Sequence, residues 1–103
     1  MRSLPEITIN SFQLAVLLDE AEKHFYNFVM ENLVFCAHCR EIATEGIEVT
    51  EVCLTAMNDV RVRGRCRKCN NEVIRLFAFG GNEMFYAKAC RLRESIKLHV
   101  IEA

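Results

Sequence analysis

Four cysteines in two C-x-x-C pairs are the residues of this chain best suited to do chemistry. Cys36 and Cys39 stand in "CAHC", and Cys66 and Cys69 stand in "CRKC". Two intervening residues let a tight turn direct both sulfurs to one point, and two such turns facing each other can surround a metal ion tetrahedrally. The spacing therefore predicts a metal site rather than four unrelated thiols.

Other uses of these cysteines are less consistent with the sequence. A disulfide framework needs an extracellular context, and the first ten residues lack the long apolar stretch of a secretory signal. A thioredoxin-like redox motif needs a helix after its C-x-x-C and a proline loop facing it, whereas strands follow here and Pro5 is the one proline. Rubredoxin-like iron remains an alternative, although rubredoxin knuckles usually carry proline and glycine beside the cysteines. We favour zinc over iron and over thiol redox chemistry.

The arrangement of residues 34–79 resembles the zinc-ribbon superfamily. It has a first C-x-x-C knuckle, an antiparallel strand pair, and a second knuckle at the start of a further strand. The resemblance implies that Cys36, Cys39, Cys66 and Cys69 bind one structural Zn²⁺. The 26 residues between the pairs exceed the ~15–20 of the compact zinc template, and the first strand with its glutamate-rich approach accounts for the excess. Asn70 and Asn71, just after the second knuckle, are suited to the left-handed backbone that such turns often need.

Hydrophobic periodicity predicts a long N-terminal helix over residues 11–33. Leu14, Leu18, Ala21, Phe25 and Phe28 recur at steps of three and four, which places them on one helix face. Asn10 or Ser11 supplies the N-cap. The same residues are compatible with helix pairing between two subunits, so we expect either core packing or a homodimer through this helix.

The second half of the chain alternates as strands do and then becomes helical again. We expect strands at 47–56, 60–65 and 72–79, followed by a helix over about 83–95 that Asn82 caps. The predicted fold is thus α+β: a three-stranded antiparallel zinc ribbon framed by an N-terminal and a C-terminal helix. It forms one domain, 1–103, comprising 11–33, 34–79 and 82–96.

The first two strands predict their own register. A three-residue loop at 57–59 sets Leu54 opposite Val62 and Val52 opposite Gly64. The other face then carries Glu51 and Cys53 against arginines, so that apolar and charged side chains are sorted onto separate faces. The third strand, apolar on both faces except at Arg75, is expected in mid-sheet or under a helix.

Composition and motifs argue against catalysis and against a membrane location. A net charge of −1 predicts no global attraction to polyanions, and no apolar run approaches the ~20 residues that span a bilayer. The sequence shows no nucleophile–base–orienter set and no phosphate-binding glycine loop, and a closed four-thiolate site has no place for an activated water. We therefore expect a soluble cytoplasmic protein that is not an enzyme and takes no small-molecule substrate. The roles of Cys53 and Cys90 stay open.

One segment, "RVRGRCRKC", concentrates positive charge. Its members are Arg61, Arg63, Arg65, Arg67 and Lys68. Alternation directs the three strand arginines to one side, while the other two residues lie at the knuckle, and such a stripe can contact DNA or RNA phosphates. The competing interpretation is local charge balance, because glutamates lie on the neighbouring strand and basic residues offset four thiolates.

These observations lead to two functional predictions. The first is a small non-enzymatic zinc-ribbon protein that serves as a nucleic-acid-associated regulator or adaptor through residues 61–68. The alternative is a protein–protein interaction module or homodimeric scaffold that does not bind nucleic acid. Its interface would use aromatic residues of the two helices.

Overall fold

The computed structural model describes the backbone of residues 4–102 and the side chains of residues 4–96. The predicted domain, 1–103, also includes residues 1–3 and 103, which lie outside the described residues. The elements are β1 (Ile7–Ile9), α1 (Ser11–Leu17), α2 (Glu20–Asn32), β2 (Phe35–Cys36), β3 (Glu41–Ile42), β4 (Ile47–Leu54), β5 (Val60–Cys66), β6 (Glu72–Phe77), the 3₁₀ turn η1 (Phe79–Gly81) and α3 (Glu83–Glu102). The fold is α+β, as predicted.

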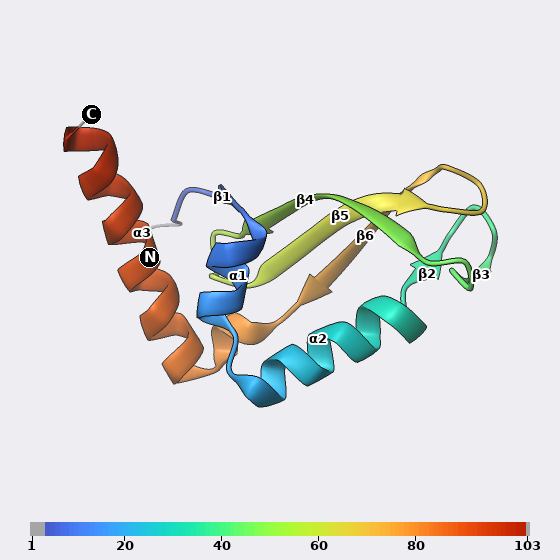
Figure 1. Ribbon diagram of the computed structural model, residues 1–103, viewed down its shortest axis with the longest axis horizontal. Helices are drawn as coiled ribbons and strands as arrows, with labels where there is room; N and C mark the ends of the chain where they lie inside the picture. The colour runs from blue at the N-terminus through green and yellow to red at the C-terminus, as the bar shows by residue number, and fades with distance from the viewer. Residues whose placement is uncertain (1–3, 103) are drawn as a thin grey trace.

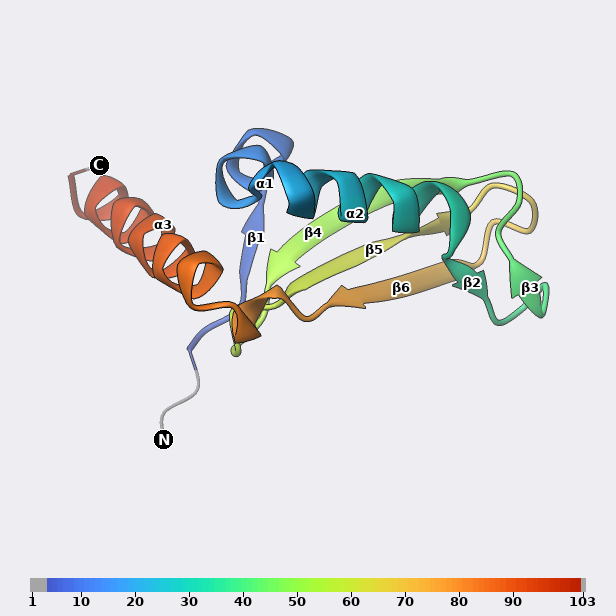
Figure 2. The same cartoon turned by 90° about the horizontal axis from the view of Figure 1, so that it is seen from below.

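The main sheet has four antiparallel strands in the order β1-β4-β5-β6, and β2 and β3 form a separate small hairpin. Helices α1 and α2 lie on one side of this sheet, and α3 packs at the end opposite the two knuckles (Figures 1 and 2). The three predicted strands are present. The third, β6, is an edge strand rather than a mid-sheet strand, but it lies under α2, whose Tyr26 ring is 4.9 Å from that of Phe77 between ring centres. The strand β1 was not predicted, because three residues are too few for alternation to be recognised.

The predicted helix 11–33 is two helices, which corrects the sequence interpretation. The chain leaves α1 at Leu18, whose backbone is extended, and Asp19 then caps α2. The Asp19 carboxylate accepts from the backbone N–H of Glu22 at 2.7 Å, and the Glu22 side chain accepts from the N–H of Asp19 at 2.9 Å. This capping box starts a new helix where apolar periodicity alone suggested a continuous one. The predicted cap at Asn10 is confirmed, with Gln13 as its reciprocal partner.

The break also changes which side chains of α2 face the sheet. Val29 is fully buried, and Tyr26 and Met30 pack against the core. The predicted stripe placed Phe25 and Phe28 inward, but their side chains are 50% and 57% exposed. Two residues between the helices do not have helical geometry, so side chains of α2 point in other directions than they would in one continuous helix. The apolar stripe that begins in α1 therefore does not continue along α2.

We expect the α2 cap to contribute measurably to stability. Asp19→Ala removes the acceptor for the Glu22 N–H and should lower the free energy of unfolding by about 1 kcal/mol. Urea denaturation measures this effect. Asp19→Asn retains a capping oxygen and should stay within a few tenths of a kcal/mol of the wild type. Equal stability of all three proteins would mean that the cap is energetically silent.

The β4–β5 hairpin keeps the predicted faces but not the predicted register. Leu54 pairs with Val60 and Cys53 with Arg61, so the loop spans residues 55–59 instead of 57–59. The shift is two residues, and side chains therefore remain sorted by face, with Glu51 opposite Arg63. The loop is stabilised within itself, because the Thr55 hydroxyl accepts from the N–H groups of Met57 and Asp59.

A β-bulge between Val49 and Glu51 shifts the register again toward the knuckle end. Beyond it, Val49 pairs with Gly64. A Cβ at Gly64 would lie 2.5 Å from the carbonyl oxygen of Glu48, so only glycine fits this close approach of the two strands.

Buried residues form two clusters at opposite parts of the molecule. The main core joins α1, α2, α3 and the sheet and consists of Ile9, Leu14, Leu17, Leu18, Val29, Leu54, Val60, Val62, Phe77, Phe85 and Ala89. A second cluster lies at the knuckle end and contains Val34, Cys36, Ala43, Cys66 and Val73. We call the second cluster, with its two knuckles, the metal end. Its core is small and includes two of the predicted metal ligands.

The C-terminal helix is longer than predicted. The Asn82 side chain accepts from the backbone N–H groups of Met84 and Phe85, which confirms the predicted cap. The helix continues to Glu102 instead of ending near residue 95. Among the described residues, no helix has the length and apolar character needed to cross a membrane.

Candidate metal site

The first knuckle is the turn of the β2–β3 hairpin. Cys36 ends β2, and the chain reverses through Cys39 to Arg40, whose N–H donates to the carbonyl of Cys36 at 2.8 Å. Arg40 has a φ of 60°, in the left-handed region. The backbone N–H of Cys39 lies 3.5 Å from the sulfur of Cys36 and donates to it.

The second knuckle joins β5 to β6 and repeats this geometry. The N–H of Asn70 donates to the carbonyl of Cys66 at 2.7 Å, and Asn70 has a φ of 62°. Of the two candidates from the sequence, Asn70 has the left-handed backbone and Asn71 does not. The matching position in the first knuckle, Arg40, was not predicted, since arginine gives no sequence signal for this conformation.

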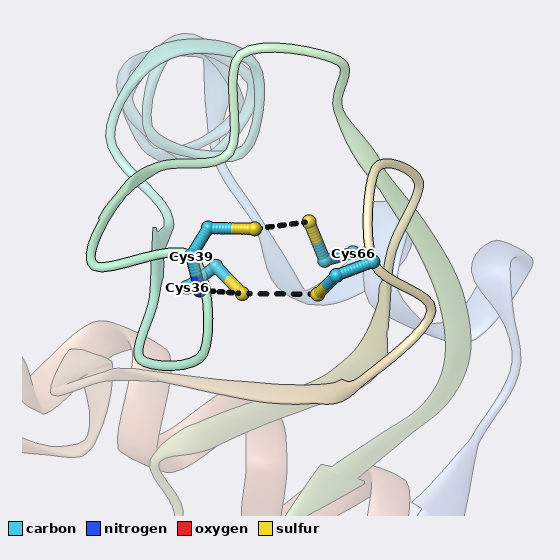
Figure 3. Close-up of side chains that lie close together, drawn as sticks. Cys36, Cys39 and Cys66 are labelled. Atoms are coloured by element: carbon cyan, nitrogen blue, oxygen red, sulfur yellow. Dashed lines mark hydrogen bonds between the residues drawn. The ribbon is translucent and has the colours of Figure 1, made fainter.

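The four sulfurs of the knuckles converge on one point. All lie within 4.8 Å of one another; the Cys36–Cys69 pair is 3.5 Å apart and the Cys39–Cys66 pair 4.0 Å. In Figure 3 the side chains of Cys39 and Cys66 point toward each other across the gap between the knuckles. A disulfide needs about 2.05 Å between sulfurs, whereas four thiolates at ~2.3 Å from a tetrahedral zinc lie ~3.8 Å apart. The cluster fits a metal ion, and all four thiols are free.

The electrostatics of the cluster also favour a cation. Desolvation and hydrogen bonds with the neighbouring thiols raise the pKa of Cys39 to about 12. Hydrogen bonds from the Asn71 side chain and backbone lower the pKa of Cys69 to about 6. One thiol thus ionises readily, while its desolvated neighbour keeps its proton. A divalent cation stabilises thiolates at such a site and allows all four to be ionised together.

The basic segment is largely paired with carboxylates. Arg61 makes two hydrogen bonds to Glu6, at 2.8 and 2.9 Å, and Lys68 donates to Glu41 at 3.0 Å. Arg63 lies 3.5 Å from a carboxylate oxygen of Glu51 and 3.6 Å from one of Glu72. Local charge balance therefore accounts for three of the five basic residues.

The other two basic residues, Arg65 and Arg67, are exposed. Within the part of the chain that the structure describes, neither has a carboxylate within ion-pair distance. Arg67 instead places its backbone N–H on the carbonyl of Gly46, which ties the second knuckle to the approach of β4.

Neither remaining cysteine joins the metal cluster. Cys53 lies on the arginine face, as predicted, but it is buried, and its thiol donates to Glu51 at 3.3 Å. Burial raises the pKa of Cys53, which makes it a poor nucleophile. Cys90 is half-buried on α3 and accepts from the side-chain amide of Asn58 at 3.8 Å.

Comparison of this chain with protein-family models, with curated proteins and with solved structures found no match. The function must therefore be argued from the site and the surface.

Proposed function

We propose that this protein is a non-enzymatic binding module whose fold depends on one structural Zn²⁺ held by Cys36, Cys39, Cys66 and Cys69. The observation that carries the proposal is the convergence of four free thiols within 4.8 Å. Four thiolates complete a tetrahedral zinc shell, which leaves no position for an activated water or a substrate. The two similar knuckles and the strands between them support a zinc-ribbon relationship for residues 34–79. Thiols kept for a metal suit a reducing compartment such as the cytoplasm.

Metal analysis of the purified protein tests this proposal directly. We expect one equivalent of zinc per chain by inductively coupled plasma mass spectrometry, and no visible absorption. One equivalent of iron with a thiolate-to-iron charge-transfer band would instead indicate a rubredoxin-like site. Metal-free protein with a native melting profile would contradict any structural metal.

Zinc affinity should rise with pH, because the ligands must lose their protons to bind. Cys69, with a pKa of about 6, is already ionised at pH 7, whereas Cys39, with a pKa of about 12, gives up its proton only when the metal arrives. For each proton that metal binding releases, the zinc affinity rises by about tenfold per pH unit. Competition with a chromophoric chelator at pH 6.5, 7.5 and 8.5, corrected for the chelator's own protonation, measures the slope. An affinity independent of pH would rule out bound thiols that ionise on metal uptake.

We further propose that the partner is a protein. Ion pairs to Glu6, Glu41, Glu51 and Glu72 neutralise most of the basic segment. Apolar side chains, in contrast, stand exposed on both N-terminal helices: Phe12, Val16, Phe25 and Phe28. A surface rich in exposed aromatic groups supports protein contact more than phosphate contact. A homodimer through α1 and α2 is one form that such contact can take.

Nucleic acid is the second candidate, and the exposed Arg65 and Arg67 support it. A titration against generic DNA and RNA at increasing salt separates the two functions. We expect no binding even at 50 mM salt. Salt-sensitive binding that is lost in a double variant with Arg65→Gln and Arg67→Gln would instead favour a nucleic-acid function. Arg61→Gln is the matched control, because Arg61 is held by Glu6.

A further inference from the structure

Among the described residues, more than half of one edge of the main sheet has no partner strand. On the side of β4 away from β5, β1 pairs only with Val52, Cys53 and Leu54. The chain then turns away at Asn10, whose capping box starts α1. Residues 47–51 of β4 therefore direct backbone N–H and C=O groups toward a side where no strand of the described residues lies. Such an edge is a template for another extended chain.

A groove follows this open edge. Two cavities, of about 580 and 390 Å³, lie along it and have Tyr26 and Val49 in common in their walls. Helix α2 and the start of α1 form the opposite wall, and Leu14, Leu18 and Met30 contribute apolar surface. In Figures 1 and 2 α2 lies over one face of the main sheet.

The exposure of Val49 indicates that a strand could be added over the groove. It lies two positions from Ile47, which packs against the metal-end core, so both side chains are on the helix-covered face of the sheet. Yet Val49 is 45% exposed. An inward-facing valine left half exposed, beside unpaired strand edge, is the position that an added strand would cover.

We propose that residues 47–51 of β4 bind an extended peptide segment of a partner protein, which adds a strand beside β1 and inserts alternate apolar side chains into the groove over Val49. Backbone hydrogen bonds supply affinity in this mode, and side-chain pockets at alternate positions supply selectivity. β1 already pairs with the adjoining residues of the same edge, so the edge accepts antiparallel chain directly next to the proposed site. This inference rests on the proposal that the partner is a protein. It adds which surface of this chain binds the partner and what kind of segment the partner supplies.

The bulge in β4 favours a peptide over a second copy of this chain. It lies between Val49 and Glu51, and the hydroxyl of Thr50 donates to the carbonyl of Arg63 at 3.2 Å. A bulge bends and twists an edge, which disfavours the flat pairing of two preformed sheets. A flexible peptide can follow the bent edge.

The probes for the test are synthetic hexapeptides in which valine, isoleucine, leucine or phenylalanine alternates with threonine, each carrying a terminal lysine pair and a fluorescein. Binding is measured by fluorescence anisotropy on the zinc-loaded full chain and mapped by ¹⁵N amide shifts. We expect saturable binding by at least one peptide, with the largest shifts at residues 47–51. Methylating alternate backbone nitrogens of that peptide should weaken binding by about tenfold or more while keeping its side chains.

Protein variants locate the site. Val49→Lys should weaken peptide binding by about tenfold or more, since it places a charge in the groove. Ile74→Lys is the matched control, an exposed β-branched residue on β6, and should leave binding unchanged. Zinc content and melting temperature of both variants show that the fold is retained, so failure here is separable from failure of the metal proposal.

Three results would overturn the peptide site. The first is no binding by any probe at 1 mM. The second is shifts confined to residues 72–77. The third is a stable dimer that Val49→Lys dissociates, which would assign the edge to a second copy. Salt-sensitive nucleic-acid binding through Arg65 and Arg67 would instead remove the protein-partner proposal itself.

Discussion

Cys36→Ser is expected to abolish stoichiometric zinc binding and to unfold the metal end. Structural zinc contributes on the order of 10–16 kcal/mol to the folding of zinc-finger peptides, which equals or exceeds the ~5–15 kcal/mol net stability of an ordinary domain. Without the ion, five small buried residues hold this part of the molecule together. Cys36 is itself one of them and is fully buried.

Cys36→Ser should unfold the metal end first and then destabilise the rest of the domain. β5 and β6 run from the metal end into the main core, where Val60, Val62 and Phe77 are buried. We therefore expect Cys36→Ser to lose amide hydrogen-exchange protection across residues 34–46 and 64–73. Its melting temperature should fall by about 20 °C or more, given ~4–8 °C per kcal/mol for a domain of this size.

The matched control for this experiment is Cys53→Ser. Cys53 is also buried but lies outside the cluster, and a serine hydroxyl can still donate to Glu51. We expect this variant to keep one equivalent of zinc and to melt close to the wild type. Cys36→Ser protein that retains full zinc and a normal melting temperature would contradict the structural site.

The second large effect is expected at Asn58, in the loop between β4 and β5. Asn58 is the one buried polar residue among those the structure describes, and it has a φ of 60°. Its carbonyl oxygen accepts from Arg93 Nε at 2.7 Å, and its amide donates to Cys90. The same arginine donates to the carbonyls of Thr55, at 2.8 Å, and Pro5. Arg93 thus fastens α3 to the β4–β5 loop and to the approach of β1.

Asn58→Ala should lower the free energy of unfolding by about 2–5 kcal/mol. It places a Cβ-bearing residue without a local hydrogen bond in the left-handed region, at ~1–2 kcal/mol, and it leaves a partly buried guanidinium without one acceptor, at ~1–3 kcal/mol. Desolvation already lowers the pKa of Arg93, so that group is sensitive to the loss of a partner. Denaturant unfolding of the zinc-loaded protein is the measurement.

Two further variants separate the causes. Asn58→Gly keeps the left-handed backbone conformation and loses only the side-chain hydrogen bonds. It should therefore be less destabilised than Asn58→Ala by the ~1–2 kcal/mol that the left-handed backbone costs alanine. Asn58→Asp keeps the acceptor for Arg93 and should be the least destabilised of the three. If all three variants unfold like the wild type, the network does not hold α3 in place.

Much of the metal site follows from sequence, because its signals are local. The C-x-x-C spacing, the left-handed Asn70 and the caps at Asn10 and Asn82 each depend on a few consecutive residues, and all appear in the structure. The C-terminal helix α3 and the three main strands were found for the same reason, since their periodicity repeats within one segment. The identity of the ion and of the partner stays a proposal.

Local signals mislead where two of them compete. Apolar spacing predicted one helix through 11–33, but the Asp19–Glu22 capping box prevailed and left Phe25 and Phe28 half exposed. Apolar content placed the third strand in mid-sheet or under a helix. It is an edge strand on which Ile74 and Leu76 are half exposed, and its Phe77 lies against Tyr26 of α2.

The order of residues along the chain is enough to name the possible metal ligands and the charged faces of the strands. The convergence of the four sulfurs, the neutralisation of basic residues by Glu6 and Glu41 from 55 and 27 positions away, and the partial cover of β4 by β1 become known from the folded chain alone. These features depend on pairing between distant segments. Loop length, a bulge and the end of a short strand set that pairing, and none of them has a periodic signature in the chain.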